Sequence, residues 1–205
     1  MTKHDPDTIY DRLIGTLVAD LHRRRAGHDA PREGSVFPAF RLPDERGVLC
    51  DLSQVLARGP VVISFIRGQW CPYCQEELAS WKNAIPALQA AGTTLICITP
   101  ETGGAAKAIR SSVSPEFTLL CDVDHGLSLS LGLAFHLGQA FIDQYKADGV
   151  DLAAIYGSAA GILPIPATFA LDRDGVVRAA HVEPDFRIRA KPDDMIRALA
   201  VPAKG

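Results

Sequence analysis

Two cysteines, Cys71 and Cys74, stand between an apolar run and a run with helical character. The apolar run, 61–66, has the composition of a strand buried on both faces, and the helical run extends over 72–91. Residues at this spacing in the first turn of a helix lie on one face, so the pair can close a small disulfide. Unpaired backbone N–H groups and the positive end of the helix dipole stabilise a thiolate at Cys71. Because the thiolate is the nucleophilic form of cysteine, we predict that Cys71 attacks and that Cys74 resolves the product.

The composition is that of a globular domain in a reducing compartment. The chain has 205 residues, of which 47% are hydrophobic and 22% are charged, enough for one sizeable core. Its net charge of −3 gives no electrostatic reason to expect nucleic acid or an anionic membrane as a partner. No apolar run approaches the ~20 residues of a membrane span, and the first residues lack the apolar core of a signal peptide. We therefore expect a cytoplasmic chain, where a Cys-x-x-Cys motif indicates redox turnover or metal binding.

Segments of strand and helix character alternate, which predicts a central sheet flanked by helices. The expected strands are 48–50, 61–66, 93–98, 117–121, 167–171 and 176–182, the last two forming an antiparallel hairpin around a turn at 172–175. The expected helices are 52–56, 72–91, 103–111, 139–146 and 192–199. Residues 26–46, 149–152 and 157–161 are expected to be loop. The alternating apolar residues from Leu127 to Leu137 by themselves predict a strand.

Residues 1–33 are predicted to form a helical extension and linker, and residues 34–205 the main domain. Asp5 can cap the helix and Pro6 can occupy its first position. Apolar positions recur about every four residues along it: Ile9, Leu13, Ile14, Leu17, Val18 and Leu21. We favour a helix packed on the side of the domain over a dimerisation arm, so a homodimer stays an open alternative.

The segment from Phe65 to Cys74 resembles the active-site segment of peroxiredoxin-like members of the alkyl hydroperoxide reductase/thiol-specific antioxidant family. Residues 164–175 and 181–192 are similar to the later hairpin and the C-terminal segment of these proteins, so the resemblance covers roughly 34–200. It implies an α/β thioredoxin-like fold with a mixed central sheet, flanking helices and an added N-terminal helix. It also implies a helix at 126–132, which we prefer there to the strand. The implied activity is reduction of peroxides or disulfides by Cys71.

Pro166 stands directly before strand 167–171, where the thioredoxin-like architecture has a cis proline. We therefore predict a cis Ile165–Pro166 bond within reach of the Cys71 sulfur, presenting backbone to a substrate without an N–H donor. With Trp70, Pro72 and Thr168, Pro166 is expected to line the substrate-binding site.

Two positions depart from the typical family pattern. Gly68 stands where a threonine is usual, three residues before the nucleophile, and Pro166 stands where an arginine is usual. In the family these two side chains bind the peroxide oxygens and stabilise charge on the leaving hydroxide. We hypothesise that Arg67 supplies the missing cation as a third catalytic residue, against the alternative of a solvated loop arginine. A peroxide pocket that is half built predicts slow peroxidase activity.

Three functional classes stay open, with the first preferred. The first is a thiol peroxidase that takes a peroxide substrate and is regenerated by a thioredoxin-like or small-thiol reductant, with no cofactor. The second is a thiol-disulfide oxidoreductase acting on protein disulfides through a mixed disulfide at Cys71. The third is a redox sensor or binding module without enzymatic activity.

The other chemically capable residues have simpler interpretations. Zinc needs about four ligands, usually in two pairs, and the remaining cysteines are isolated, so no metal site is expected. Cys97 is interpreted as a buried core thiol, and Cys121 as a strand-end residue rather than a neighbour of Cys71. Glu76 and Glu77 are interpreted as charges that compensate the helix dipole.

Overall fold

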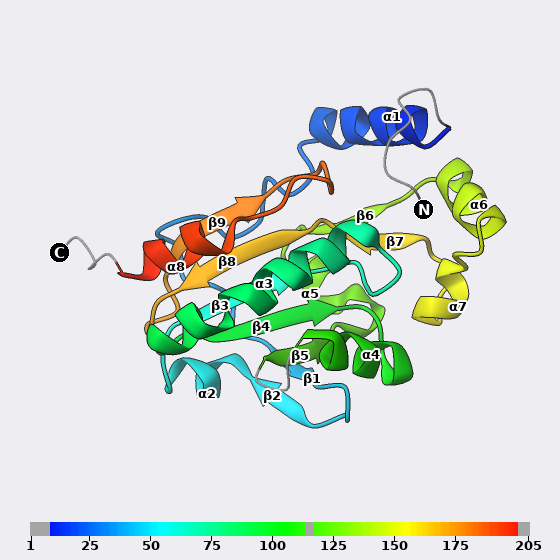
Figure 1. The fold of residues 1–205 in the computed structure, drawn as a ribbon. Coiled ribbons are helices and arrows are strands. Elements are labelled where there is room, and N and C mark those ends of the chain that lie inside the picture. Colours follow the sequence, from blue (N-terminus) through cyan, green and yellow to red (C-terminus); the bar gives the residue numbers. More distant parts are fainter. Residues whose placement is uncertain (1–8, 114–116, 201–205) are drawn as a thin grey trace.

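The computed structural model describes residues 9–113 and 117–200. At its centre lies a five-stranded sheet with the order β5-β4-β3-β8-β9 (Figure 1). Its strands are β3 (Val61–Phe65), β4 (Thr94–Thr99), β5 (Thr118–Cys121), β8 (Ala167–Leu171) and β9 (Val177–Val182). β3, β4 and β5 run parallel, whereas β8 is antiparallel to both β3 and β9. The predicted mixed sheet and the predicted hairpin of the last two strands are therefore confirmed.

The central strands of the sheet are buried on both faces, since every residue of β3 and β8 is buried, whereas the edge strand β9 is partly exposed. Val61, Ile63 and Phe65 of β3 point into one hydrophobic cluster, and Val62 points into the other. This alternation is the period of two that a strand imposes on its side chains. A strand that is covered on both sides needs layers of helices above and below, and these layers hold the ends of the central strands in place.

Helices α3 (Pro72–Ala90), α4 (Gly103–Val113) and α8 (Pro192–Ala200) cover one face of the sheet (Figure 1). The cluster on the other face includes residues of α1 (Ile9–Arg23), α2 (Leu52–Leu56), α5 (Gly126–Ser130) and α6 (Gln139–Ala147). The predicted helices at 52–56, 72–91, 103–111, 139–146 and 192–199 are thus all present. None of the described helices is both long and apolar enough to cross a membrane.

Helix α1 packs against the domain through its apolar stripe. Ile14, Leu17 and Leu21 are buried in the core cluster, and the ring of Tyr10 lies 6.1 Å from that of Phe141 in α6, measured between ring centroids. This agrees with the preferred packing on the side of the domain. The proposed capping by Asp5 and Pro6 lies outside the described residues.

Several short elements differ from the prediction. The expected loop 26–46 contains β1 (Arg41–Pro43), which pairs with β2 (Leu49–Asp51). β6 (Ala134–His136) pairs with β7 (Ile162–Pro164), and a short helix α7 (Leu152–Tyr156) precedes β7, with a 3-10 turn at Val123–His125. β2 overlaps the strand predicted at 48–50, whereas β1, β6 and β7 were missed because three residues carry little alternation.

The alternating leucines after residue 126 do not form one strand. Residues 126–130 are helical, as the family resemblance implies, and strand structure begins only at Ala134. Leu129 is 54% exposed while Leu127 and Leu131 are buried, so these side chains do not share one face. A run this short satisfies a helical pattern and a strand pattern equally well.

The predicted cis proline is wrong. No peptide bond in the described part of the chain is cis, so the Ile165–Pro166 bond is trans. Residues 165 and 166 link β7 to β8. Trans is the lower-energy form for such a link, and the cis form costs about 0.5–1 kcal/mol even before proline.

Candidate active site

The two cysteines lie where a central strand leads into the longest helix of the described chain. Cys71 is the N-cap of α3 with an extended backbone, and Pro72 occupies the first helical position. The N–H groups of Cys74 and Gln75 donate to the Cys71 carbonyl at 3.0 and 3.1 Å. Both sulfurs are reduced, and both residues are fully buried. The predicted placement of the pair at a helix start is confirmed.

Arg67 reaches the sulfur of Cys71 directly. Its Nη2 donates to Cys71 Sγ at 2.9 Å, and the residue is 1% exposed. The guanidinium carbon lies 3.8 Å from the ring centroid of Phe186 and 5.1 Å from that of Trp70. Nε and Nη1 have no hydrogen-bond partner among the described residues. The alternative of a solvated loop arginine is therefore wrong, because the guanidinium lies buried among the Cys71 sulfur, two aromatic rings and Tyr145, whose pKa it acts to lower.

These contacts separate the pKa values of the two thiols. Burial acts to raise the pKa of Cys71, but a hydrogen bond from the Cys74 thiol and the charges of Arg67 and Arg189 outweigh it and hold this pKa well below its usual range. Burial raises the pKa of Cys74 well above its usual range, and the hydrogen bond and charge of Cys71 raise it further. These opposite shifts favour a Cys71 thiolate beside a Cys74 thiol.

Tyrosines from α6 and α7 support the other side of Arg67. The Tyr156 hydroxyl donates to the Arg67 carbonyl at 2.6 Å and accepts from Trp70 Nε1 at 2.8 Å. The ring of Tyr145 packs edge-on against Trp70 at 5.2 Å between centroids. Burial raises the pKa of Tyr145, so its hydroxyl stays protonated. Trp70 is thus fixed at its polar atom and on its ring.

A carboxylate occupies the space where the usual threonine side chain would lie. Gly68 has a φ of +144°, and a Cβ there would collide with the carboxylate of Glu101. That carboxylate accepts the Gln69 N–H at 3.0 Å, and burial raises its pKa. Glu101 follows the end of β4, so the loop before Cys71 is held by the neighbouring parallel strand.

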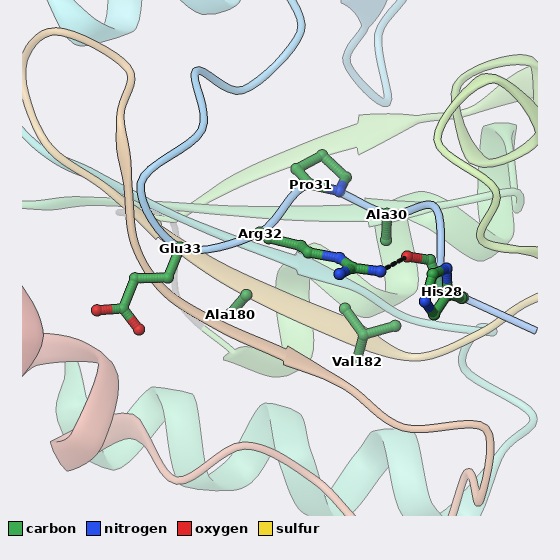
Figure 2. Close-up of a pocket in the computed structure, with 8 residues that line it drawn as sticks. His28, Ala30, Pro31, Arg32, Glu33, Ala180 and Val182 are labelled. Carbon is green, nitrogen blue, oxygen red and sulfur yellow. Dashed lines mark hydrogen bonds between the residues drawn. The ribbon is translucent and has the colours of Figure 1, made fainter. Parts of the chain in front are cut away.

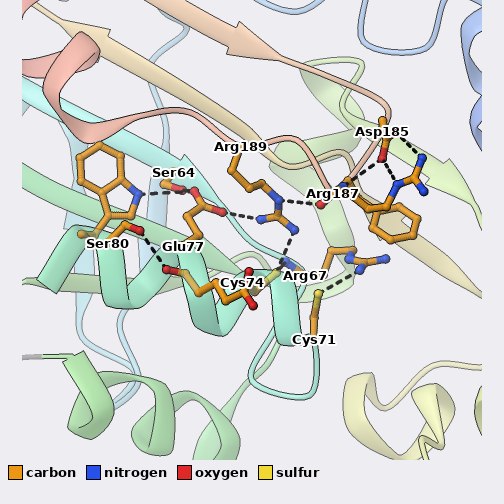
Figure 3. Close-up of polar contacts among 12 residues, drawn as sticks. Ser64, Arg67, Cys71, Cys74, Glu77, Ser80, Asp185, Arg187 and Arg189 are labelled. Atoms are coloured by element: carbon orange, nitrogen blue, oxygen red, sulfur yellow. Dashed lines mark hydrogen bonds and ion pairs between the residues drawn. The ribbon is translucent and has the colours of Figure 1, made fainter. Parts of the chain in front are cut away.

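A second buried network lies behind Cys74 (Figure 3). Arg189 forms an ion pair with Glu77, and its Nη2 donates to Cys74 Sγ at 3.5 Å. Glu77 also accepts from Ser64 Oγ at 2.6 Å and from Trp81 Nε1 at 3.4 Å. Glu77 was interpreted only as a helix-start charge that compensates the dipole, but the residue is 5% exposed and paired with Arg189. Its spacing from Cys74 and Trp81 puts it on the buried face of α3, which is a signal the sequence does contain.

The remaining predicted binding residues lie around the pair at different depths. The register opposes Phe65 to Ala167, so buried Pro166 lies just beyond the strand end from which Arg67 follows. Thr168 is opposite Ser64 within the sheet and is 1% exposed. Pro72, like Trp70, is half-buried. Binding roles for these four residues stay predictions.

The other cysteines are poor nucleophiles. Cys97 is a fully buried core residue, as predicted, and burial raises its pKa well above the usual range. Burial and nearby carboxylates raise the pKa of Cys121 to about 11, and β5, which it ends, is separated from β3 by β4. Cys50 is half-buried, and burial raises its pKa. Among residues 9–113 and 117–200, no group of three or more His, Cys, Asp or Glu side chains could hold a metal.

A pocket distant in sequence from the cysteines lies beside β9 (Figure 2). Its wall includes His28, Pro31 and Arg32 on one side and Val182 on the other, and Arg32 Nη2 donates to the His28 carbonyl at 2.6 Å. None of the cysteines or predicted site residues lines it. The chemistry therefore belongs to the buried pair and not to this pocket.

Comparison with known proteins agrees with this geometry. The sequence model described as the AhpC/TSA family matches residues 34–180. The chain is similar to the chloroplastic peroxiredoxin Q of Suaeda salsa, with 27% identity over 149 residues. This match covers 73% of the chain and 59% of the relative, less than two thirds of its length.

Solved structures show the same fold. The crystal structure of peroxidoxin BcpB from Mycobacterium tuberculosis matches with a TM-score of 0.65 and 19% identity, over 83% of this chain and 97% of that one. The Xanthomonas campestris bacterioferritin comigratory protein matches with a TM-score of 0.60 and 16% identity, over 80% of this chain and 91% of that one. The predicted thioredoxin-like α/β fold is confirmed by these likenesses.

Proposed function

The chain belongs to the AhpC/TSA family, and from that premise we propose that it is a thiol peroxidase in which the Cys71 thiolate reduces hydrogen peroxide or an organic hydroperoxide. The observation that carries this proposal is the contact between Arg67 Nη2 and Cys71 Sγ at 2.9 Å, made in a fully buried site. The work on the Xanthomonas protein concerns alkyl peroxide reduction, which adds support from a protein of the same fold.

The reaction begins with attack of the Cys71 thiolate on the terminal peroxide oxygen. A sulfur–oxygen bond forms, the oxygen–oxygen bond breaks, and the alkoxide or hydroxide leaves and takes up a proton. The products are a sulfenic acid at Cys71 and an alcohol or water. Arg67 neutralises charge on the attacking sulfur, and its N–H groups would stabilise the charge that develops on the leaving oxygen. Cys74 then condenses with the sulfenic acid to a disulfide.

Burial of the sulfur favours a small oxidant. Cys71 and Cys74 are 0% exposed, so a peroxide can reach the thiolate with far less rearrangement than a protein disulfide. The alternative of a thiol-disulfide oxidoreductase would need the segment around Trp70 and Pro72 to open first. We propose that a thioredoxin-like protein or a small thiol regenerates the oxidised pair in a reducing, cytoplasmic compartment. The missing threonine hydroxyl at position 68 leads us to propose a rate below that of dedicated peroxiredoxins.

Single-turnover kinetics of the reduced chain test this function. Trp70, whose ring stacks on Arg67, serves as the fluorescent reporter. We expect oxidation by hydrogen peroxide and by an organic hydroperoxide, and much slower reaction with a protein disulfide. Rapid reaction with the disulfide and none with either peroxide would establish the oxidoreductase alternative. A near-diffusion-limited rate with hydrogen peroxide would contradict the incomplete pocket.

Replacement of Arg67 tests the residue that carries the proposal. Removing one stabilising donor costs about 10²–10³ in rate, so Arg67→Met should slow Cys71 oxidation by roughly a hundredfold or more. Arg67→Lys keeps the charge without the planar donor array and should recover only part of the rate. Arg23→Met, on an exposed part of α1, removes the same charge and is the matched control. Equal rates for Arg67→Met and Arg23→Met would leave Arg67 without a catalytic role.

A further inference from the structure

We propose that Arg189, held in place by Glu77, is a catalytic residue of the second half-reaction, in which Cys74 attacks the Cys71 sulfenic acid. The proposal rests on the proposed function, because the sulfenic acid is the product of peroxide reduction. The role of Arg189 is distinct from that of Arg67, whose side chain contacts the Cys71 sulfur.

Three contacts fix the Arg189 guanidinium against Cys74 (Figure 3). Nη1 forms the ion pair with Glu77, Nε donates to the Phe186 carbonyl at 2.7 Å, and Nη2 is left to donate to Cys74 Sγ at 3.5 Å. The side chains of Arg189 and Glu77 are 11% and 3% exposed. A planar guanidinium that is held at Nε and Nη1 has little rotational freedom, so its Nη2 stays directed at Cys74 Sγ.

The stability of the fold does not by itself explain the buried Arg189–Glu77 ion pair. Burying two charges costs solvation energy that their attraction often does not exceed, and apolar residues of the same volume frequently stabilise a fold as well. Here Glu77 has further donors in Ser64 and Trp81, so the carboxylate is anchored from the sheet and from its own helix. This network of buried polar groups contacts the Cys74 sulfur through Arg189, which indicates that the network acts on the chemistry of Cys74.

The side chains of Arg67 and Arg189 contact different sulfurs. The Arg67 side chain faces Cys71 Sγ, and only its backbone N–H reaches Cys74 Sγ, at 3.3 Å. Arg189 is therefore the side-chain cation with a hydrogen bond to the resolving sulfur. Since Cys74 must become a thiolate before it can attack, a positive donor at this sulfur lowers the energy of the reactive form.

Oxidation of Cys71 changes the contributions to the pKa of Cys74 just before Cys74 has to attack. In the reduced pair, burial and then the hydrogen bond and charge of Cys71 keep the pKa of Cys74 high, while Arg189 and Arg67 oppose them. A sulfenic acid carries no thiolate charge, so the charge contribution of Cys71 to this pKa is lost, while those of burial and of the two arginines remain. The pKa of Cys74 consequently falls after the first half-reaction.

The resolving step is balanced without any further reagent. The Cys74 thiolate attacks the Cys71 sulfur, the sulfur–sulfur bond forms, and the sulfur–oxygen bond breaks. The departing hydroxide combines with the proton released by Cys74 to give water. The net reaction converts a sulfenic acid and a thiol into a disulfide and water.

Stopped-flow fluorescence separates the two half-reactions, because the first depends on peroxide concentration and the second does not. In Arg189→Gln we expect the second phase to slow by about tenfold or more and its pH midpoint to rise. Arg189→Lys should recover part of the rate. Glu77→Gln, which frees the guanidinium while keeping the shape, should slow the same phase. The first phase should slow less than the second, because Arg67 still contacts Cys71 directly while Arg189 acts on that thiolate only through its charge.

Arg187→Gln is the matched control. Arg187 lies on the same segment and pairs with Asp185 at 2.7 Å, so it reports the cost of losing a nearby ion pair without a contact to sulfur. Its second phase should keep the rate and pH midpoint of the unmodified chain. In Arg189→Gln, dimedone should trap more Cys71 sulfenic acid, and excess peroxide should convert more of it to sulfinic acid.

The outcomes separate the inference from the function on which it rests. An unchanged second phase and pH midpoint in both Arg189→Gln and Glu77→Gln would overturn the role of Arg189. The same slowing in Arg187→Gln would also overturn it. Absence of the first phase in the unmodified chain would instead reject peroxide reduction. If Arg189→Gln does not fold, the pH midpoints of the second phase are compared in Arg189→Lys and Glu77→Gln instead.

Discussion

At the scale of residues, the site shows how a fully buried sulfur can still ionise. Burial opposes the charge on Cys71, and near contacts favour it: a thiol hydrogen bond, the Arg67 guanidinium and the more distant Arg189. The contacts prevail because a low-dielectric environment strengthens attraction at short range as well as penalising an isolated charge. The cation is in turn retained in the interior by the faces of Phe186 and Trp70.

The pH dependence of alkylation should distinguish the two thiols. Because the pKa of Cys71 is lowered, its thiolate should persist below the usual titration of cysteine near pH 8.5, and reactivity should fall only at more acidic pH. The raised pKa of Cys74 predicts the opposite, with little reaction until alkaline pH. Iodoacetamide rates against pH in the intact reduced pair measure both thiols, and Cys74→Ser and Cys71→Ser identify which of them carries the acid-range reactivity. Cys71→Ser also removes the hydrogen bond and charge that help to raise the pKa of Cys74. Acid-range reactivity that is lost with Cys74 rather than Cys71 would reverse the assigned roles.

Local sequence was sufficient for some residues of the site and insufficient for others. Arg67, Cys71 and Cys74 are neighbours in one loop and one helical turn, so their spacing indicates their proximity. Arg189 is 115 residues from Cys74, and Glu101 is 32 residues from Gln69, so only the folded sheet and its helices bring these pairs together. Glu77 was interpreted only as a charge that compensates the helix dipole, because its partner Arg189 lies 112 residues away in the sequence.

At the scale of elements, the loop between β3 and α3 determines the position of Arg67 and Cys71. Its backbone turns through Gly68 at a φ that other residues adopt only with strain. Glu101 after β4 and Tyr156 at the end of α7 hold it from two sides. The long apolar strands and α3 were predictable because each carries a clear pattern over many residues. α7 was missed although α2, which is equally short, was predicted. Asp151 caps α7 as Asp51 caps α2, so the sequence does contain a signal for it.

Replacing Gly68 by the threonine usual in the family should destabilise this loop and not improve catalysis. The strained φ costs about 1–3 kcal/mol, and the new side chain would also displace the Glu101 carboxylate. Chemical denaturation and peroxide single turnover measure the two effects. Gly138→Ala is the control for strain alone, since Gly138 has φ 89° and ψ 143° with open space around it. A faster peroxide reaction in Gly68→Thr would show that the pocket lacks only a hydroxyl.

At the scale of the whole molecule, the two layers of helices keep water and large substrates from the sulfurs. The face toward α3 and α8 contains both cysteines and the Arg189 network, and the opposite face anchors α1 and α6. Tyr145 links these parts, because it packs on Tyr10 of α1 and on Trp70 beside Cys71. Docking of α1 is therefore connected to the active site through one aromatic ring.

The packing of α1 predicts how the free energy of unfolding changes when its apolar side chains are replaced by alanine. Leu17 is 9% exposed, so Leu17→Ala should lower the free energy of unfolding by about 2–3 kcal/mol. Ile9, at the start of the same helix, is 46% exposed, and Ile9→Ala should change it by less than about 0.5 kcal/mol. Denaturant titration gives both values, and size-exclusion chromatography checks the oligomeric state. A dimerisation arm would show the reverse, with Ile9→Asp dissociating a dimer and Leu17→Ala leaving the monomer stable.

The close approach of Glu101 to Gly68 also links the evolutionary histories of these two positions. A mutation of Gly68 alone meets the carboxylate, and loss of Glu101 alone leaves the Gln69 N–H without its acceptor. We therefore expect each single change to destabilise the loop more than the paired change does, which is the pattern called reciprocal epistasis. Related chains should consequently carry either both residues or neither, and the threonine should return only where the acid has been replaced.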